Sequence, residues 1–314
     1  MEKIKTIAAK FWLVLAVLLW LLTSPGHAAT IKLTCSAKET IGNAVKKLKP
    51  GDTLSVTGTC NENLVIPEET ARVVLDGQAK ATINGPDTSN PTIVVNGRGI
   101  TVKGFTVTGG RDGIVVSRGG QAVIDSNTIQ GTGRFGVQVN QTSFAVIVNN
   151  TIQNNQGNGI TLGGSSYAVI GFFTALDKTA SPNTIQNNGQ NGISVGRSSN
   201  ARITGNTIRN NKLNGVLVTR ASQADITSST IDSNGMNGID VSQNSSAQLG
   251  ADKGTGIFES PNTTTAGNGQ FGIKCAVNSS ADGRIGTLNG KNGAKDFDNS
   301  CVDSLEAVVL GKQE

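Results

Sequence analysis

Histidine and tryptophan are nearly missing from this chain of 314 residues, which contains one His, two Trp, one Tyr and nine Phe. His27, Trp12 and Trp20 all fall within the first 28 residues, a segment that we expect to be removed during export. The remaining chain would then have no imidazole for Ser–His or Cys–His catalysis, and none to bind zinc or copper. It would also lack the indole rings on which many sugars stack. Histidine-dependent enzymes and metal sites are therefore excluded.

The N-terminal segment has the pattern of a secretory signal peptide. A short basic stretch precedes an apolar run from Phe11 to Leu22, and small residues follow, with Gly26 and Ala28 placed for cleavage after Ala28. No second long apolar run follows, so we expect a secreted or periplasmic protein without a membrane span after cleavage. The predicted divisions are a signal peptide (1–28), an N-terminal capping segment and helix (29–50), a repeat region (51–300) and a C-terminal tail (301–314).

The chain also has little excess of one sign of charge over the other. The full chain has 27 basic and 22 acidic side chains, and loss of Lys3, Lys5, Lys10 and Glu2 with the signal peptide would reduce its net charge from +5 to +3. A balance this close to neutral gives no indication of a nucleic-acid partner. We expect a monomer that binds no nucleic acid.

Four cysteines in an exported chain predict two disulfides. The sequence permits three pairings of Cys35, Cys60, Cys275 and Cys301, and we expect the two local ones, Cys35–Cys60 and Cys275–Cys301. Each would close a loop of roughly 25 residues and stabilise the fold by about 3 kcal/mol. Free buried thiols are the alternative.

A repeat of 23 residues organises most of the remaining chain. The glycine before each apolar triplet recurs at intervals of 23, 23, 33, 23, 23 and 34 residues. Apolar residues alternate in short bursts separated by Gly, Asn and Ser, which predicts three short β-strands per unit. A unit this small cannot bury its own inward face, so the copies must stack. The repeated glycines are Gly113, Gly136, Gly159, Gly192, Gly215, Gly238 and Gly272.

An asparagine recurs at the end of most units, usually followed by Thr and Ile. It occupies Asn127, Asn150, Asn183 and Asn206. Asparagine tolerates the backbone angles of a tight turn, and stacked amides can bond to the copies above and below. We therefore predict a structural ladder of asparagines and assign these residues no catalytic role.

These "NTIxxNxxNGIxV" units resemble the parallel β-helix repeats of the right-handed, pectin-lyase-like superfamily, over roughly Gly51 to Asp296. The resemblance implies an all-β fold, a right-handed parallel β-helix of about ten three-strand coils. The N-terminal block beginning "TIGNAVKKLKPGD" is also similar to that superfamily. Ser36 and Glu39 form a capping-box signature, which predicts a short helix ending before Pro50 and capping the open end of the solenoid.

The superfamily includes pectate and pectin lyases, polygalacturonases, mannuronan epimerases and periplasmic accessory proteins of copper-enzyme maturation. Polygalacturonases need clustered aspartates and a His, which are not evident here. Epimerases share an Asp-Pro-His element, of which "GIDVS" matches only the acid, Asp240. Met236 would be the only methionine left for a role in copper maturation. The resemblance thus specifies a fold and leaves the activity open.

A lyase of this superfamily would need acidic calcium ligands and a basic residue that removes the proton beside a uronate carboxylate. The candidate catalytic residues are Asp112, Asp240 and Lys274. Asp240 and Lys274 fall on adjacent coils, where a cross-strand ion pair is the alternative role. Calcium would be the cofactor of such a lyase, whereas a binding protein would need no cofactor or metal.

Five arginines motivate a ligand hypothesis. Arg118, Arg197 and Arg220 lie five residues after a strand glycine, and Arg111 and Arg134 lie two before one. On consecutive coils such like charges repel, a cost that an anion between them would offset. The alternative is that the side chains splay into solvent, where repulsion is screened. We predict that the five arginines edge a shallow groove for an acidic polysaccharide.

Two functions therefore remain open. One is an exported β-helix protein that binds an anionic polysaccharide or acts as a surface or periplasmic scaffold. The other is a divergent polysaccharide lyase or other carbohydrate-active enzyme. Two longer units, Ile170–Asn183 and Leu249–Asn262, carry extra loop residues that are either decoration of the repeat or functional loops.

Overall fold

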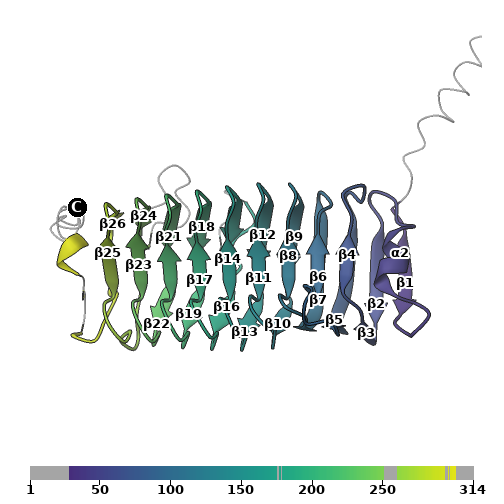
Figure 1. The fold of residues 1–314 in the computed structure, drawn as a ribbon, viewed down its shortest axis with the longest axis horizontal. Coiled ribbons are helices and arrows are strands. Elements are labelled where there is room, and N and C mark those ends of the chain that lie inside the picture. The colour runs from purple at the N-terminus through teal and green to yellow at the C-terminus, as the bar shows by residue number, and fades with distance from the viewer. Residues whose placement is uncertain are drawn as a thin grey trace, which may run out of the picture.

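The computed structural model describes residues 28–174, 177, 179–250, 260–293, 296 and 298–301. The predicted signal peptide up to residue 27, the tail after Cys301 and most of the second long unit lie outside these residues. The described chain forms a parallel β-helix whose coils stack side by side in a single row (Figure 1). The predicted all-β fold is confirmed.

One sheet consists of nine short parallel strands, one from each coil, and its outward face proves to carry the candidate site. Neighbouring strands in this sheet come from consecutive coils, so residues of equal position in the repeat lie next to one another. The strands are β4 (Leu64–Ile66), β6 (Ile93–Val95), β8 (Ile114–Val116), β11 (Val137–Val139), β14 (Ile160–Leu162), β17 (Ile193–Val195), β20 (Val216–Val218), β23 (Ile239–Ser242) and β25 (Ile273–Ala276).

The other two sides of the coils belong to a sheet of 17 strands. One side contains β1 (Thr30–Thr34), β2 (Thr53–Thr57), β5 (Val74–Gly85), β7 (Ile100–Gly109), β9 (Gln121–Asp125), β12 (Phe144–Val148), β15 (Tyr167–Ile170), β18 (Asn200–Thr204), β21 (Gln223–Thr227), β24 (Ser246–Leu249) and β26 (Ser280–Gly283). The long strands β5 and β7 continue around the corner. The next side contains β3 (Thr59–Asn61), β10 (Thr128–Gln130), β13 (Thr151–Gln153), β16 (Thr184–Gln186), β19 (Thr207–Arg209) and β22 (Thr230–Asp232).

Stacked columns of Ile, Val and Leu fill the interior as one continuous core. Ile129, Ile152, Ile185, Ile208 and Ile231, for example, follow one another in register and are all fully buried. Each side chain therefore packs against its own equivalents in the coils on either side. This arrangement follows from the alternation of inward and outward residues along a strand.

The asparagine ladder predicted from the sequence is present. The backbone N–H of Asn150 donates to Oδ1 of Asn183 at 2.9 Å, and that of Asn183 donates to Oδ1 of Asn206 at 3.0 Å. The side-chain Nδ2 of Asn183 also donates to Asn206 Oδ1 and to the carbonyl oxygen of Ile147. The amide thus forms hydrogen bonds with backbone groups that are buried at the turn, away from water.

The N-terminal end differs in detail from the prediction. The helix is short, α2 (Ile41–Val45), and its N-cap is Thr40, whose hydroxyl accepts from the N–H of Asn43. Ser36 Oγ accepts from Glu39 N, as in a capping box, but the chain does not become helical there. The carboxylate of Glu62, from the first coil, instead accepts the N–H groups of Ile41 and Gly42.

Strand β1, which the sequence did not predict, pairs with β2 over Thr30–Thr34. It extends the sheet by one strand beyond the first coil. Helix α2 lies at this same end of the row (Figure 1). The solenoid is thus closed by a strand and a short helix together.

Both expected disulfides are present. Cys35 bonds to Cys60 and Cys275 to Cys301, with Cα–Cα distances of 5.1 and 5.2 Å. One fastens the segment of β1 to the first coil, and the other fastens the last described residues to β25. None of the described helices is long and apolar enough to span a membrane.

The first long unit leaves the coil after β15 and returns at β16 without changing the register, since Ile160 still pairs with Ile193. Its Phe172 is 1% exposed and packs outside the solenoid against Val146, Val148 and Val169. The loop thereby covers an apolar patch on the face of β12 and β15. This packing role accounts for the described part of the insertion.

The ladder leads to a stability prediction. Replacing Asn183 with alanine would leave the backbone N–H of Asn150 buried without this partner, while the carbonyl of Ile147 would keep the N–H of Gly171. Because an unsatisfied buried group costs about 1–3 kcal/mol, we expect the free energy of unfolding to fall by about that amount. Urea unfolding followed by circular dichroism measures it.

Asn200, exposed on β18, provides the matched control. Asn200→Ala should change the free energy of unfolding by no more than about 0.5 kcal/mol, the range of ordinary surface substitutions. Equal losses in the two variants would contradict the ladder's structural role.

Candidate functional site

The outward face of the nine-strand sheet has a floor, formed by one column of side chains. One side chain per coil points out from the middle of each strand, and these side chains are in register. The first three are apolar, the next three carry an amide or a hydroxyl, the seventh is apolar again, and the last two are charged. In coil order they are Val65, Val94, Val115, Gln138, Thr161, Ser194, Leu217, Asp240 and Lys274.

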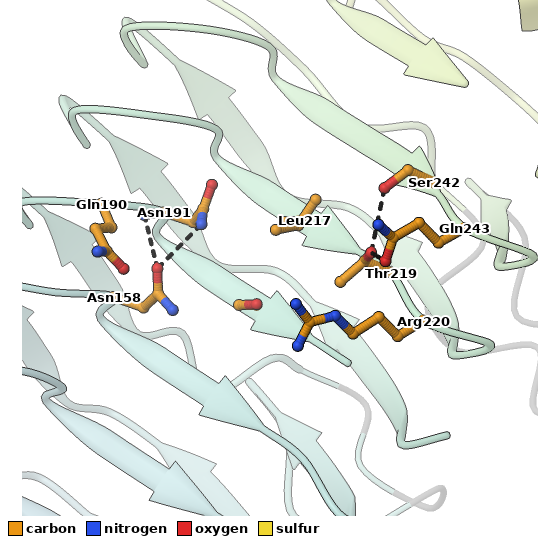
Figure 2. Close-up of a pocket in the computed structure, with 9 residues that line it drawn as sticks. Asn158, Gln190, Asn191, Leu217, Thr219, Arg220, Ser242 and Gln243 are labelled. Carbon is orange, nitrogen blue, oxygen red and sulfur yellow. Dashed lines mark hydrogen bonds between the residues drawn. The ribbon is translucent and has the colours of Figure 1, made fainter. Parts of the chain in front are cut away.

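A shallow depression of about 500 Å³ lies over the uncharged part of this floor around Ser194 and Leu217. Ser194 and Leu217 line its bottom, Asn158 and Asn191 line one edge, and Arg220 lines the other. Figure 2 shows the Arg220 side chain extended across the strands, with its guanidinium group directed toward Asn158 and Asn191. The exposed Arg220 side chain therefore lies over the depression.

The edge that precedes the strands is a second asparagine ladder. Nδ2 and the backbone N–H of Asn191 both donate to Oδ1 of Asn158, and Asn214 and Asn237 continue the series toward the C-terminus. This ladder was not predicted from the sequence, although the Asn-Gly pair before each of these strands was a signal for it. It makes one edge of the depression rigid.

The opposite edge is a turn in which each coil places a residue in the left-handed backbone region. The φ angles in this column lie between 54° and 63°. Asparagine and glycine adopt that region at lowest cost, and asparagine occupies it elsewhere, at Asn149, Asn154, Asn187 and Asn210. Here the chain instead uses Arg118, Gln141, Gly164, Arg197, Arg220, Gln243 and Val277. Three arginines and two glutamines of this column thus place long polar side chains along the edge of the floor.

The five predicted arginines are divided between the two edges. Arg118, Arg197 and Arg220 lie on the turn edge, whereas Arg111 and Arg134 lie on the edge before the strands. Arg197 lies along the surface, with Cδ at 3.8 Å from the position that a Cβ on Gly163 would occupy. Neither Arg197 nor Arg220 forms an ion pair with any carboxylate of the described residues. Arg118 approaches Glu68 at 3.8 Å, with both side chains largely exposed.

Asp112 is fully buried between Arg111 and Arg134. Its carboxylate accepts from Nε of Arg111 at 3.0 Å and from Nε and Nη2 of Arg134, both at 2.8 Å. A carboxylate enclosed by two guanidinium groups is an ion-pair centre and has no free oxygen with which to act on a substrate. The structure thus places this predicted catalytic candidate in a charged cluster with two of the predicted ligand-binding arginines.

Asp240 and Lys274 lie side by side at the far end of the floor. Burial raises the pKa of Asp240, while Lys274 and a hydrogen bond from Asn237 act in the opposite direction. Asp298, which the Cys275–Cys301 disulfide keeps near β25, adds a second negative charge that also raises the pKa of Asp240. These three groups form the one charged cluster on this floor among the described residues.

A calcium site was expected only if the protein is a lyase. Calcium takes six to eight oxygen ligands, several of them carboxylates. Within the described ranges, no group of three or more His, Cys, Asp or Glu side chains could hold a metal ion. Asp112 is saturated by donors, and Lys274 lies between the charges of Asp240 and Asp298. The residues of this face do not fit calcium.

The buried position of Asp240 predicts how pH affects stability. Its folded pKa exceeds the ordinary value of 3.8, so its contribution to stability is complete below the unfolded pKa and is lost as pH rises through the folded pKa. Asp240→Asn should therefore gain free energy of unfolding relative to the wild type as pH rises from below 3.8 to neutral. Denaturant unfolding at a series of pH values measures the difference.

Asp87 is the control with the opposite sign. Hydrogen bonds from Ser89 and Asn90 lower its pKa, so its stabilising contribution is present at neutral pH and is lost as pH falls. Asp87→Asn should lose stability relative to the wild type at neutral pH and converge with it in acid. The same trend in both variants would show that the burial of Asp240 does not control its ionisation.

Comparison with known proteins agrees with this architecture. The sequence pattern of the family described as "Right handed beta helix region" matches residues 54–175, 93–253 and 168–300, which overlap. Comparison with curated protein sequences gives no match.

Two solved structures share the fold. Pectate lyase Pel9A is 14% identical, with a TM-score of 0.57 over 85% of this chain and 81% of its own. The A-module of the mannuronan C-5 epimerase AlgE6 from Azotobacter vinelandii is also 14% identical, with a TM-score of 0.54 over 85% of this chain and 86% of its own. At such identity the likeness concerns the fold alone. The chain belongs to the right-handed β-helix family and has the pectin-lyase-like fold.

Proposed function

We propose that the protein is an exported binding protein for an anionic polysaccharide, which lies on the outward face of the nine-strand sheet. One observation carries the proposal. Arg197 and Arg220 stand on consecutive coils in a strained backbone conformation, lie against the surface and have no carboxylate partner among the described residues. An anion between the two guanidinium groups would relieve their repulsion and accept paired hydrogen bonds.

The rest of the face supports a carbohydrate as the carrier of that anion. The floor beside Arg220 presents the hydroxyl of Ser194, and the far edge presents amides of Asn158 and Asn191. Hydroxyls and amides of this kind can bond to sugar hydroxyls, while the absence of charge from this part of the floor avoids repelling an acidic chain. The proteins of the same fold are named for pectate and mannuronan, so linear uronates are the first ligands to test.

Export is part of the proposal. Two disulfides fit an oxidising compartment outside the cytoplasm, where acidic polysaccharides of the envelope or surroundings are accessible. A surface or periplasmic scaffold is the alternative within the same class, and it would need no arginine-dependent affinity for a glycan. The binding experiment below separates the two.

Asp240 and Lys274 favour a second candidate, a divergent uronate lyase. In that reaction a base removes the proton beside the uronate carboxylate, the bond to the leaving glycosidic oxygen breaks, and an acid protonates that oxygen. Lys274 would be the base and Asp240 the acid, a role that the raised pKa of Asp240 favours. The candidate is weaker because Asn237 and the neighbouring strand hold Asp240 as part of the sheet surface.

Salt and arginine substitution test the binding proposal. Affinity for an acidic glycan such as polygalacturonate or alginate should fall as ionic strength rises. Arg197→Ala combined with Arg220→Ala should weaken binding by about tenfold or more, since a hydrogen bond to a charged group contributes about 1.5–3 kcal/mol. Arg209→Ala, on the outer face of β19, removes the same charge elsewhere and should leave affinity unchanged. Full affinity in the double variant would overturn the proposal.

The lyase alternative requires a separate measurement. The protein is incubated with the same polymers, with and without calcium, and ultraviolet absorbance reports unsaturated products. We expect none from a binding protein. Product formation that disappears in Lys274→Ala would establish the lyase instead.

A further inference from the structure

A second cationic cluster lies on the opposite edge of the same face, nearer the N-terminus. It consists of Arg111, Asp112 and Arg134, from the coils of β8 and β11. Oδ1 of Asp112 accepts from Arg134 Nε and, at 3.2 Å, from the N–H of Phe135, while Oδ2 accepts from Arg111 Nε and Arg134 Nη2. Four donors saturate one fully buried carboxylate, so both guanidinium groups are held in place.

The two guanidinium groups retain donors on their outer sides. Within the described residues, no hydrogen bond uses either Nη of Arg111 or Nη1 of Arg134. The side chains are 44% and 41% exposed. Arg134 stacks on the ring of Phe135 at 4.4 Å and its Nη2 reaches Oε1 of Gln138, a floor residue, at 3.4 Å. The cluster is therefore rigid, accessible and directed across the floor.

The fold itself does not require this charge. In later coils the column of Asp112 holds Asn158 and Asn191, which complete a neutral ladder. The column of Arg111 and Arg134 holds Gln190 two coils beyond β11. A buried carboxylate must be paired, but one bidentate arginine would neutralise it. The second arginine leaves a net charge of +1 on the surface.

The distance between the two arginine clusters determines what can bind to both. From the coil of β11, which carries Arg134, to the coil of β17, which carries Arg197, there are two steps of about 4.8 Å, or about 10 Å along the solenoid, and the clusters also lie on opposite edges. A short anionic ligand can occupy one cluster at a time. A longer polymer bound at Arg197 and Arg220 would hold its next anionic groups at a high local concentration near Arg111 and Arg134.

We propose that Arg111, Asp112 and Arg134 form a second anion subsite, so that the protein selects polymers long enough to reach both clusters. Arg111 and Arg134 bind the anion and Asp112 is a positioning residue. The inference rests on the proposed function and goes beyond it, because it sets a minimum ligand length. The recognised group is an oxyanion with paired oxygens, either a uronate carboxylate or a sulfate ester.

A length series tests the subsite. Isothermal titration of the full chain uses short and long oligouronates, with a sulfated oligosaccharide series and a neutral series beside them. We expect affinity for anionic ligands to rise by about tenfold or more once they can span both clusters, and no such step in the neutral series. A step in only one anionic series identifies the carboxylate or the sulfate as the recognised group.

The matched variant copies the neutral residues of a later coil. Arg111→Gln, Asp112→Asn and Arg134→Gln together install the amides found at Gln190 and Asn191, so no buried charge is left unpaired. The long-ligand step should vanish, while affinity for short ligands persists at Arg197 and Arg220. Arg111→Gln alone keeps Asp112 paired with Arg134 and should reduce the step even if the triple variant does not fold.

These measurements distinguish failure of the second subsite from failure of the proposed function. Binding without a length step in the wild type, or a step that survives in these variants, overturns the second subsite and leaves the proposed function standing. An equal loss for short and long ligands also overturns it, since the cluster would then belong to a single site. No binding by any anionic series overturns the proposed function and the subsite together.

Discussion

The stacking of equivalent coils at one strand spacing is the constraint on which every other feature depends. Each side chain meets its own equivalents before and after it, so a buried polar group at a turn must find a partner among copies of itself. An amide can do so because it donates and accepts. A hydroxyl can do so with help from the backbone, as where Ser143 N donates to Ser166 Oγ. A carboxylate cannot, because it only accepts.

That constraint explains why charge is concentrated at a few places on the face. Asp112 stands in the column that later coils fill with asparagine, and it must take donors from outside the column, which Arg111 and Arg134 supply. Arg197 and Arg220 present the opposite situation. They stand at an exposed turn where stacking brings like charges together and the described surface supplies no counter-ion. The charge of Arg111 and Arg134 is thus partly neutralised by Asp112 within the fold. The charge of Arg197 and Arg220 can be neutralised by an anion from solution.

Much of the fold could be predicted from the sequence because a 23-residue period determines which residues become neighbours. The ladder through Asn183, the inward columns and the tolerance of a long insertion all follow from that period. Strand β1 could not be predicted, since it lies before the repeat and has no copy. The first residue of α2 could not be predicted from the neighbouring sequence either. The acceptor for the N–H groups of its first turn is the carboxylate of Glu62, which is distant in sequence.

The site was less predictable for a related reason. The period placed the five arginines on consecutive coils but did not show which edge each occupies or which way its side chain turns. The involvement of Asp112 was within reach, because it occupies the column of Asn158 and therefore faces the same buried turn. Its hydrogen bonds to both neighbouring arginines depend on the direction of their side chains in the packed structure, which the repeat period does not determine.

Binding and catalysis require different properties of this face, and its geometry suits binding better than catalysis. Affinity for a polymer gains from each rigid polar group that need not be ordered on binding, and the ladder through Asn158 and Asn191 and the saturated Asp112 provide such rigidity over several coils. Elimination would need a free acid and a free base at one sugar. Asp240 is one coil beyond Arg220, so a polymer anchored there would place its next sugar over Asp240 and Lys274. Asp240 is instead engaged by a hydrogen bond from Asn237 and by the charge of Lys274 on the next strand, so this pair is poorly suited to supply a free acid and a free base.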